Sequence, residues 1–102
     1  MAIYSIPLKA TPNQELIVNL GNQNIGITLI TRNDNSLYIS VTADSETIIN
    51  NRICRANQPL IDAQYKPING ELMIVDKLGD ADPVWQDLNS RYILYWIDKD
   101  EL

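Results

Sequence analysis

Four aspartates stand close together in the stretch DKLGDADPVWQD, at positions Asp76, Asp80, Asp82 and Asp87. Carboxylate oxygens are ligands that Ca²⁺ prefers, and a pair of carboxyl groups in a cleft can perform acid–base chemistry. The spacing does not match an EF-hand loop, because the alternating oxygen ligands and the closing glutamate are missing. A structural interpretation is also open, in which Gly79 supplies a bend and Asp82 caps a helical turn that begins at Pro83.

The chain has no histidine and a single cysteine, Cys54. Without histidine, the usual nucleophile–base triads and most zinc sites are excluded. A lone cysteine cannot form an intrachain disulfide, and we expect Cys54 to be a small apolar residue in or beside a strand. The glycines are scattered and form no phosphate-binding loop. We therefore expect no enzyme activity, no metal and no other cofactor.

Aromatic residues near the C-terminus offer a second kind of chemistry: Trp85, Tyr92, Tyr95 and Trp96. Such rings stack on sugars or bases, anchor protein interfaces or fill a core. Strand alternation would place Tyr92 and Trp96 on one face and Tyr95 on the other. This pattern favours core packing, and a protein interface is the next interpretation.

The stretch IPLKATPNQ is bracketed by Pro7 and Pro12. Proline cannot donate to a ladder, so the stretch is either an ordered edge of its own domain or an arm that lies across a partner subunit. We predict an extended N-terminal arm over residues 1–14. The candidate residues for a protein interface are Ile6, Pro7, Leu8, Pro12, Asn13 and Trp85.

The chain is acidic, with a formal net charge of −5 from 13 acidic and 8 basic residues. This charge argues against nucleic acid and against an anionic membrane surface as partners. No apolar run is long enough to span a bilayer. The last four residues, Lys99 to Leu102, match an endoplasmic reticulum address. The first residues do not resemble a signal peptide and no glycosylation site is present, so we expect a non-secretory protein with a charged tail over 98–102.

Apolar and polar residues alternate in the first half of the chain. The runs ELIVNL, IGITLIT and SLYISVT predict a three-stranded antiparallel meander from about Glu15 to Thr42. The clusters GNQN and RNDNS between these runs supply residues that tolerate positive φ. The fourth run, ETIINNRICR, is less regular and predicts a strand with a bulge or an exposed edge.

The second half predicts fewer and shorter elements. A loop follows the fourth run, with at most one helical turn near Ile61 to Tyr65. ELMIVD predicts a strand, PVWQDLN a short helical turn, and RYILYWI a last strand covered on both faces. We expect one all-β, mainly antiparallel domain over residues 1–102, a small barrel or sandwich of about six strands.

Three separated stretches carry a resemblance to a known family. They are IPLKATPNQELIVNLG, YISVTADSETIINNRICRANQPLID and GELMIVDKLGDADPVWQDLNSRYILYWI. In their order and spacing they resemble the phage baseplate plug family, small domains of contractile-tailed phages and prophages, over about Ile6 to Ile97. The resemblance implies a structural protein near the central hub and spike of the baseplate, without catalytic residues.

On this resemblance, the expected partners are baseplate hub and spike proteins, with a homo-oligomer in the assembled baseplate. The expected location is the virion tail baseplate, after synthesis in the cytoplasm of the bacterial host. Alone, the chain is expected to self-associate weakly or not at all. One alternative is a β module that binds carbohydrate or another small ligand through Trp85 and the aspartate loop. Another is an acid–base enzyme that uses two of the four loop aspartates.

Overall fold

The computed structural model describes residues 3–62 and 67–98 of the chain. This part contains seven strands and one 3₁₀ helix. In chain order they are β1 (Ile3–Ile6), β2 (Asn13–Leu20), β3 (Gln23–Thr31), β4 (Leu37–Ala43), β5 (Glu46–Ile53), β6 (Gly70–Asp76), η1 (Trp85–Asp87) and β7 (Tyr92–Asp98). No helix among the described residues is long and apolar enough to cross a membrane.

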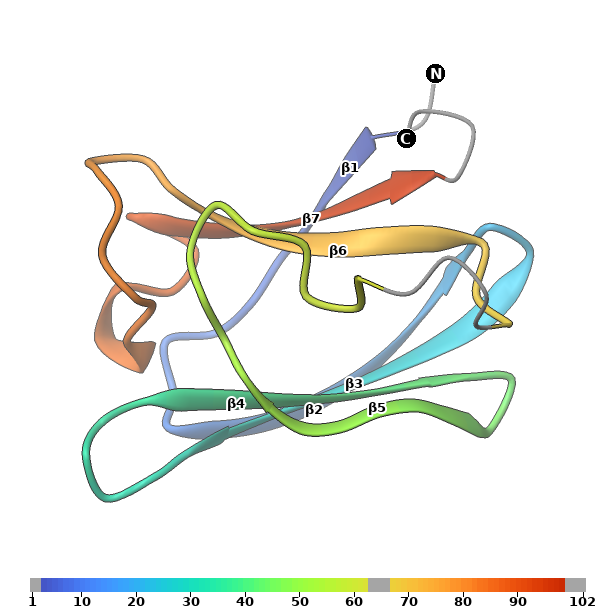
Figure 1. Ribbon diagram of the computed structural model, residues 1–102, viewed down its shortest axis with the longest axis horizontal. Helices are drawn as coiled ribbons and strands as arrows, with labels where there is room; N and C mark the ends of the chain where they lie inside the picture. Colours follow the sequence, from blue (N-terminus) through green and yellow to red (C-terminus); the bar gives the residue numbers. More distant parts are fainter. Residues whose placement is uncertain (1–2, 63–66, 99–102) are drawn as a thin grey trace.

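The strands form two antiparallel sheets that lie face to face (Figure 1). One sheet has four strands in the order β2-β3-β4-β5, and the other has three in the order β1-β7-β6. Successive side chains of a strand point to opposite faces, so each sheet can turn one apolar face toward the other. The prediction of a small all-β sandwich is confirmed, while the barrel alternative is not, because the two sheets do not close into one.

The core lies between the sheets and is built mainly from alternate residues of β3, β4, β6 and β7. Its buried residues in these strands include Ile25, Ile27 and Leu29 in β3, Leu37, Ile39 and Val41 in β4, Leu72 and Ile74 in β6, and Tyr92, Leu94 and Trp96 in β7. Cys54, just after β5, is 1% exposed, which confirms the expectation of a small apolar residue beside a strand. Burial raises the pKa of its thiol to about 12, so Cys54 is a neutral core residue.

Two-residue turns join β2 to β3 and β4 to β5. Both central residues have positive φ in each turn, at Gly21 (58°) and Asn22 (62°), and at Asp44 (50°) and Ser45 (73°). Such turns are typical of hairpins because their twist matches that of the strands they join. The predicted meander is therefore confirmed, and β5 extends it by a fourth strand.

β5 is irregular, as its sequence predicted. Its register against β4 shifts twice. Ile48 and Ile49 are both buried although they are neighbours, and Asn51 has a φ of 52°. A bulge explains this pattern, because one extra residue turns the following side chains to the other face.

The N-terminal stretch is part of the sandwich and forms an edge of its own domain, which was one of the two alternatives open in the sequence. The extended arm predicted over residues 1–14 is corrected, because these residues include β1 and the start of β2. β1 pairs with β7, where Ile6 lies opposite Leu94. Ile6 and Leu8 are only 3% and 6% exposed and belong to the core. The strand ends before Pro7 because proline cannot continue the ladder. β1 is the strand that brings the total to seven, and residues 7–12, called the lead-in below, connect it to β2.

The lead-in crosses from one sheet to the other and is fastened by side chains. Gln14 Nε2 donates to the Lys9 carbonyl oxygen at 2.6 Å, and Lys9 N donates to Gln14 Oε1 at 3.0 Å. Thr31 Oγ1 donates to the Pro12 carbonyl oxygen at 2.7 Å. These bonds satisfy main-chain groups that have no strand neighbour at the crossing.

The connection from β5 to β6 makes the second crossing. It pairs with β6 through isolated bridges, Ala56 with Ile74 and Pro59 with Met73. The buried carboxylate of Glu71 accepts hydrogen bonds from the backbone N–H of Ile61 (2.8 Å), Asp62 (2.9 Å) and Leu72 (2.9 Å). This side of the sandwich is thereby closed by the chain itself.

Two predictions fall partly outside the described residues. The helical turn expected near Ile61 to Tyr65 extends into residues 63–66, and its first two residues, Ile61 and Asp62, are not helical. Of the predicted charged tail, only Asp98 is described, as the last residue of β7.

Gly70 tests how tightly the two sheets are packed. A Cβ there would overlap the Trp96 ring and lie 2.7 Å from the Ile97 carbonyl oxygen. We expect Gly70→Ala to destabilise the fold by about 1–3 kcal/mol, because the ring cannot move within a filled core. Gly79→Ala is the matched control, since its Cβ would meet nothing closer than 3.9 Å. Urea unfolding of both variants measures the effect, and equal stabilities would contradict it.

Candidate protein interface

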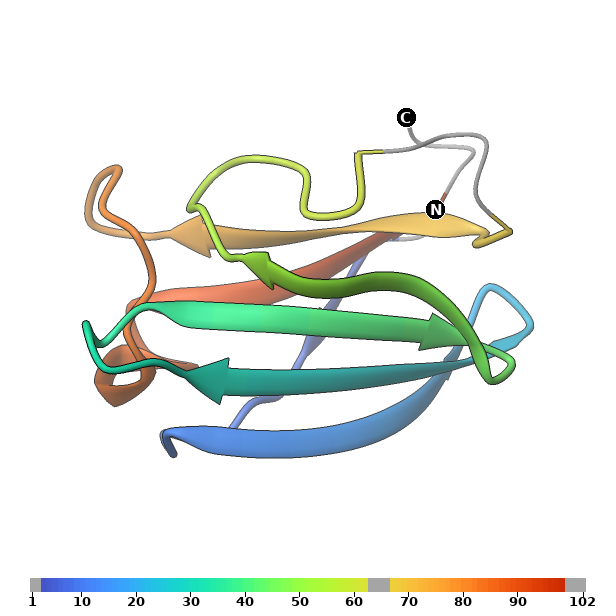
Figure 2. The same ribbon diagram turned by 60° about the horizontal axis from the view of Figure 1, so that its bottom comes forward.

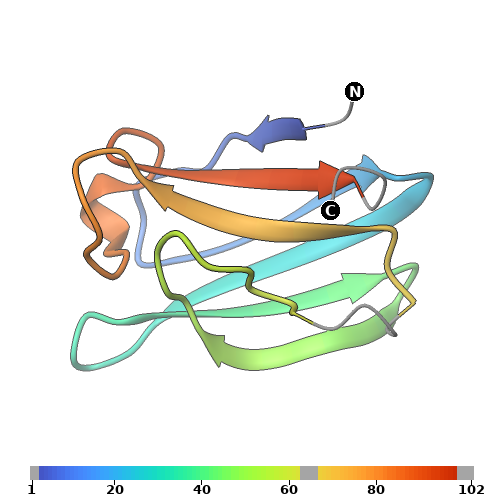
Figure 3. The ribbon, with the colours of Figure 1, turned by 45° about the horizontal axis from the view of Figure 1, so that its top comes forward.

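One end of the sandwich gathers three segments that are distant in sequence. They are the lead-in, the turn at residues 32–36 between β3 and β4, and η1, which lie at the same end in Figures 1, 2 and 3. We call this the η1 end. Asn35 Nδ2 donates to Gln86 Oε1 at 3.2 Å, so the turn and η1 are tied together. The Arg32 guanidinium lies over the Tyr38 ring at 4.9 Å and holds the other side of the turn.

Four of the six predicted interface residues reach the surface, and these are Pro7, Pro12, Asn13 and Trp85. Asn13 accepts a hydrogen bond on Oδ1 from Thr31 N at 3.2 Å, which fixes its side chain beside β3. Trp85 is partly buried and packs against the core from η1. Ile6 and Leu8, the other two, face the core of this chain and leave no side-chain surface for a partner.

η1 does not begin as the sequence predicted. Its first residue is Trp85 and its N-cap is Val84, which makes no side-chain cap bond. Asp82 was the expected cap, but its carboxylate instead binds Arg55 Nη1 at 2.7 Å. The Asp82 carbonyl oxygen accepts from the Tyr92 hydroxyl at 3.1 Å. An ion pair and a buried phenol therefore hold Asp82 in an extended stretch ahead of the helix.

Asp76 organises the loop between β6 and η1. Its carboxylate accepts from Leu78 N (2.9 Å) and Ala81 N (2.9 Å), and from Arg91 Nε (2.8 Å) and Nη2 (2.9 Å). The Arg91 guanidinium is the main reason that the pKa of this carboxyl lies far below its usual range. Asp76 is therefore ionised and fully engaged, which suits a structural anchor better than a proton carrier.

The other loop carboxylates point to separate partners. Asp80 accepts from Asn57 Nδ2 at 3.2 Å, and Asp82 binds Arg55. Within residues 3–62 and 67–98, no three acidic, cysteine or histidine side chains gather in a way that could hold a metal ion. Gly79 has no positive φ. The bend that it was expected to supply instead depends on the hydrogen bonds to Asp76.

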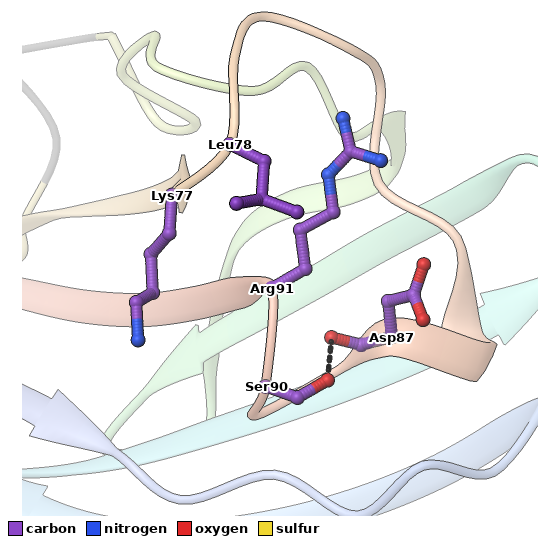
Figure 4. A pocket seen from close by; sticks show the side chains of 5 residues that line it. All are labelled: Lys77, Leu78, Asp87, Ser90 and Arg91. Carbon is purple, nitrogen blue, oxygen red and sulfur yellow. Dashed lines mark hydrogen bonds between the residues drawn. The ribbon is translucent and has the colours of Figure 1, made fainter.

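A shallow hollow lies beside this loop (Figure 4), lined by Lys77, Leu78, Asp87, Ser90 and Arg91. Its only carboxylate is Asp87, while the Ser90 hydroxyl donates to the Asp87 carbonyl oxygen at 3.0 Å. Arg91 is committed to Asp76. The hollow thus lacks the paired carboxyl groups that the acid–base alternative requires.

Sequence reasoning missed two features of the surface. Ile17 in β2 is 73% exposed. The alternation that put Leu16 and Val18 inward could have revealed it, because the residue between them must face out. The pair of Asp76 with Arg91 had no local signal, since it depends on how β6 and β7 align.

The carboxylate of Asp76 predicts a pH-dependent contribution to stability. Its pKa is lowered on folding, so the contribution is fully present above its usual value of 3.8 and is lost as the pH falls below that value. We expect Asp76→Asn to lower the melting temperature at neutral pH and to flatten its decline in acid. Asp80→Asn, an exposed control, should leave both unchanged. Parallel melting curves of Asp76→Asn and the unmodified chain across the acid range would contradict this role.

Comparison with known proteins identifies one matching family. No individually curated protein matches the chain. The sequence model of one family, described as cyanophage baseplate Pam3 plug gp18, matches residues 3–99. The match includes every described strand and the whole η1 end. A baseplate plug is a structural component of a virion tail that contacts other baseplate proteins. The chain belongs to the cyanophage baseplate Pam3 plug gp18 family.

Proposed function

We propose that this chain is a structural protein of a phage or prophage contractile-tail baseplate, where it acts as a plug or adaptor near the central hub and spike. The observation that carries the proposal is the family match over residues 3–99. In this role the chain works through protein–protein contacts and catalyses no reaction. It is made in the cytoplasm of the bacterial host and resides in the tail baseplate of the virion.

We infer that the η1 end supplies the contact with the hub or spike. Its exposed residues belong to segments that are already fixed, the lead-in by Gln14 and Thr31, and the turn at 32–36 by Gln86. A surface that is ordered before binding loses little conformational entropy when a partner docks. Pro7 and Pro12 add to this rigidity, and Trp85 is the kind of side chain that anchors interfaces.

Ile6 and Leu8 serve the same contact indirectly. Both are buried, and they hold the ends of the segment that carries Pro7 against the core. Their role is to position the lead-in. A partner would recognise the exposed prolines and Asn13 that this packing presents.

The η1 end carries charges of both signs, with Lys9 and Arg32 beside Asp34 and Asp87. Complementary charges steer association and suppress wrong partners, so a partner at this end would present both acidic and basic groups. The net charge of −5 of the whole chain disfavours nucleic acid as a ligand.

The carbohydrate-binding alternative loses its support. Of the loop carboxylates that it would use with Trp85, Asp76 and Asp82 are paired with Arg91 and Arg55, and Asp80 accepts from Asn57. Asp87 alone would not make the cluster of carboxylates on which this alternative was based. We therefore propose no second function.

Removal of the gene from the phage or prophage that carries it tests the role. We expect tails without the protein to be defective, and a plasmid copy to restore them with the protein present in purified, salt-washed tails. Absence of the protein from such tails would overturn the proposed function.

Point variants test the η1 end as the contact surface. We expect Pro12→Glu and Trp85→Ala to reduce incorporation about tenfold, the effect of losing one central interface contact. Thr47→Glu, an exposed change on β5, is the control and should incorporate normally. Melting temperatures must be measured in parallel, because Trp85 also packs against the core. Normal incorporation of both η1-end variants would place the contact elsewhere.

A further inference from the structure

β2 differs from the other edge strands because it lacks the features that commonly block pairing with a strand of another chain. β1 is four residues long and stops at Pro7. The outer edge of β6 is covered by the bridges from Ala56 and Pro59. β5 is bulged, and Arg52 reaches from it to the carbonyl oxygens of the following loop. β2 has eight residues without proline, lysine or bulge, and of the described strands only β3 pairs with it (Figure 2).

The free hydrogen-bonding groups of this edge can be identified from the register. A two-residue turn makes Leu20 and Gln23 a hydrogen-bonded pair, so Asn19 and Asn24 are a non-hydrogen-bonded pair. The hydrogen bonds of Asn24 support this assignment. Its N–H donates to Asp44 Oδ1 and its C=O accepts from Asp44 N, both on the side away from β2. The main-chain groups of Glu15, Ile17 and Asn19 therefore point away from β3.

Both faces of the same strand offer surface that an added strand would cover. The outer face carries Glu15, Ile17 and Asn19, and Ile17 is 73% exposed. The inner face carries Leu16 and Val18, which are only partly buried because the sandwich ends beside them. Natural proteins rarely leave such an edge bare, since it is a template for pairing with another chain.

We propose that β2 pairs antiparallel with β2 of a second copy of this chain, with Ile17 opposite Ile17. In this register Glu15 lies opposite Asn19, and Leu16 lies opposite Val18. The exposed groups of Glu15, Ile17 and Asn19 all find main-chain partners, and apolar side chains meet on both faces. The two four-stranded sheets become one.

The observations favour a second copy because the edge is complementary to itself. The proposed register puts no charge opposite a like charge or an aliphatic side chain. A shift that centres the pair on Glu15 would oppose two carboxylates, and a shift that centres it on Asn19 would leave Ile17 opposite Gly21. The net charge of −5 per copy keeps the pairing weak in dilute solution, while an assembly raises the local concentration.

Thiol cross-linking tests the register on the full-length chain. Cys54 is the only native cysteine and is buried, so an introduced cysteine can be addressed alone. We expect Ile17→Cys to form covalent dimers with a short bismaleimide. Leu78→Cys is the matched control, because Leu78 is 77% exposed but lies outside the edge. Glu15→Cys should cross-link to Asn19→Cys in a mixture and poorly to itself. Equal yields from Leu78→Cys and Ile17→Cys, or a higher yield from Glu15→Cys alone, would overturn the proposal.

Sedimentation across a concentration series tests the energetics. Ile17→Lys should raise the dissociation constant of the dimer at least about tenfold, because it replaces an apolar pair with two like charges. Leu78→Lys should leave it unchanged. A chain that stays monomeric at all concentrations and forms no Ile17→Cys dimers would overturn the pairing. That result would leave the baseplate role intact, since the role rests on the family.

Discussion

The burial of one apolar sheet face against another is the constraint on which the rest of the structure depends. Because one chain supplies both sheets, it must change sheets twice, before β2 and after β5. Each crossing leaves main-chain groups without a strand neighbour. At the second crossing these groups are buried or partly buried, where an unsatisfied group is costly, and Glu71 accepts from Ile61 and Asp62. At the first crossing the main chain of Lys9 is exposed, and Gln14 fastens it with two hydrogen bonds. Glu71 thus allows the core to close at one crossing, and Gln14 fixes the path of the chain at the other.

The elements that sequence could predict are those whose cause is local. Alternation and turn residues lie within each hairpin, so the meander of β2, β3 and β4 followed from the sequence, and so did the irregular β5. β1 was missed because four residues carry too little alternation and Pro7 suggested an arm. Its cause is β7, which lies at the other end of the sequence. The burial of Ile6 and Leu8 follows from that pairing.

In the candidate site, too, local causes could be predicted from the sequence and contacts with distant residues could not. Capping rules assign Asp82 to the start of a helical turn, but Arg55, from beyond β5, competes for the carboxylate and wins. Likewise, Asp76 meets Arg91 only because β6 and β7 align so that Asp76 lies opposite Tyr92. Such pairs depend on tertiary register, so spacing along the chain could suggest a cluster of aspartates but could not reveal that they point to different partners.

The two proposed surfaces place a geometric limit on how the protein can be used. β2 begins at the η1 end with Asn13 and runs to the opposite end of the sandwich at Leu20. Antiparallel pairing of two copies therefore sets their η1 ends at opposite ends of the joined sheet. One flat hub surface could engage only one of these ends. If both contacts form in one assembly, the second η1 end must face another protein, so a pair of copies would connect two components of the baseplate instead of capping one.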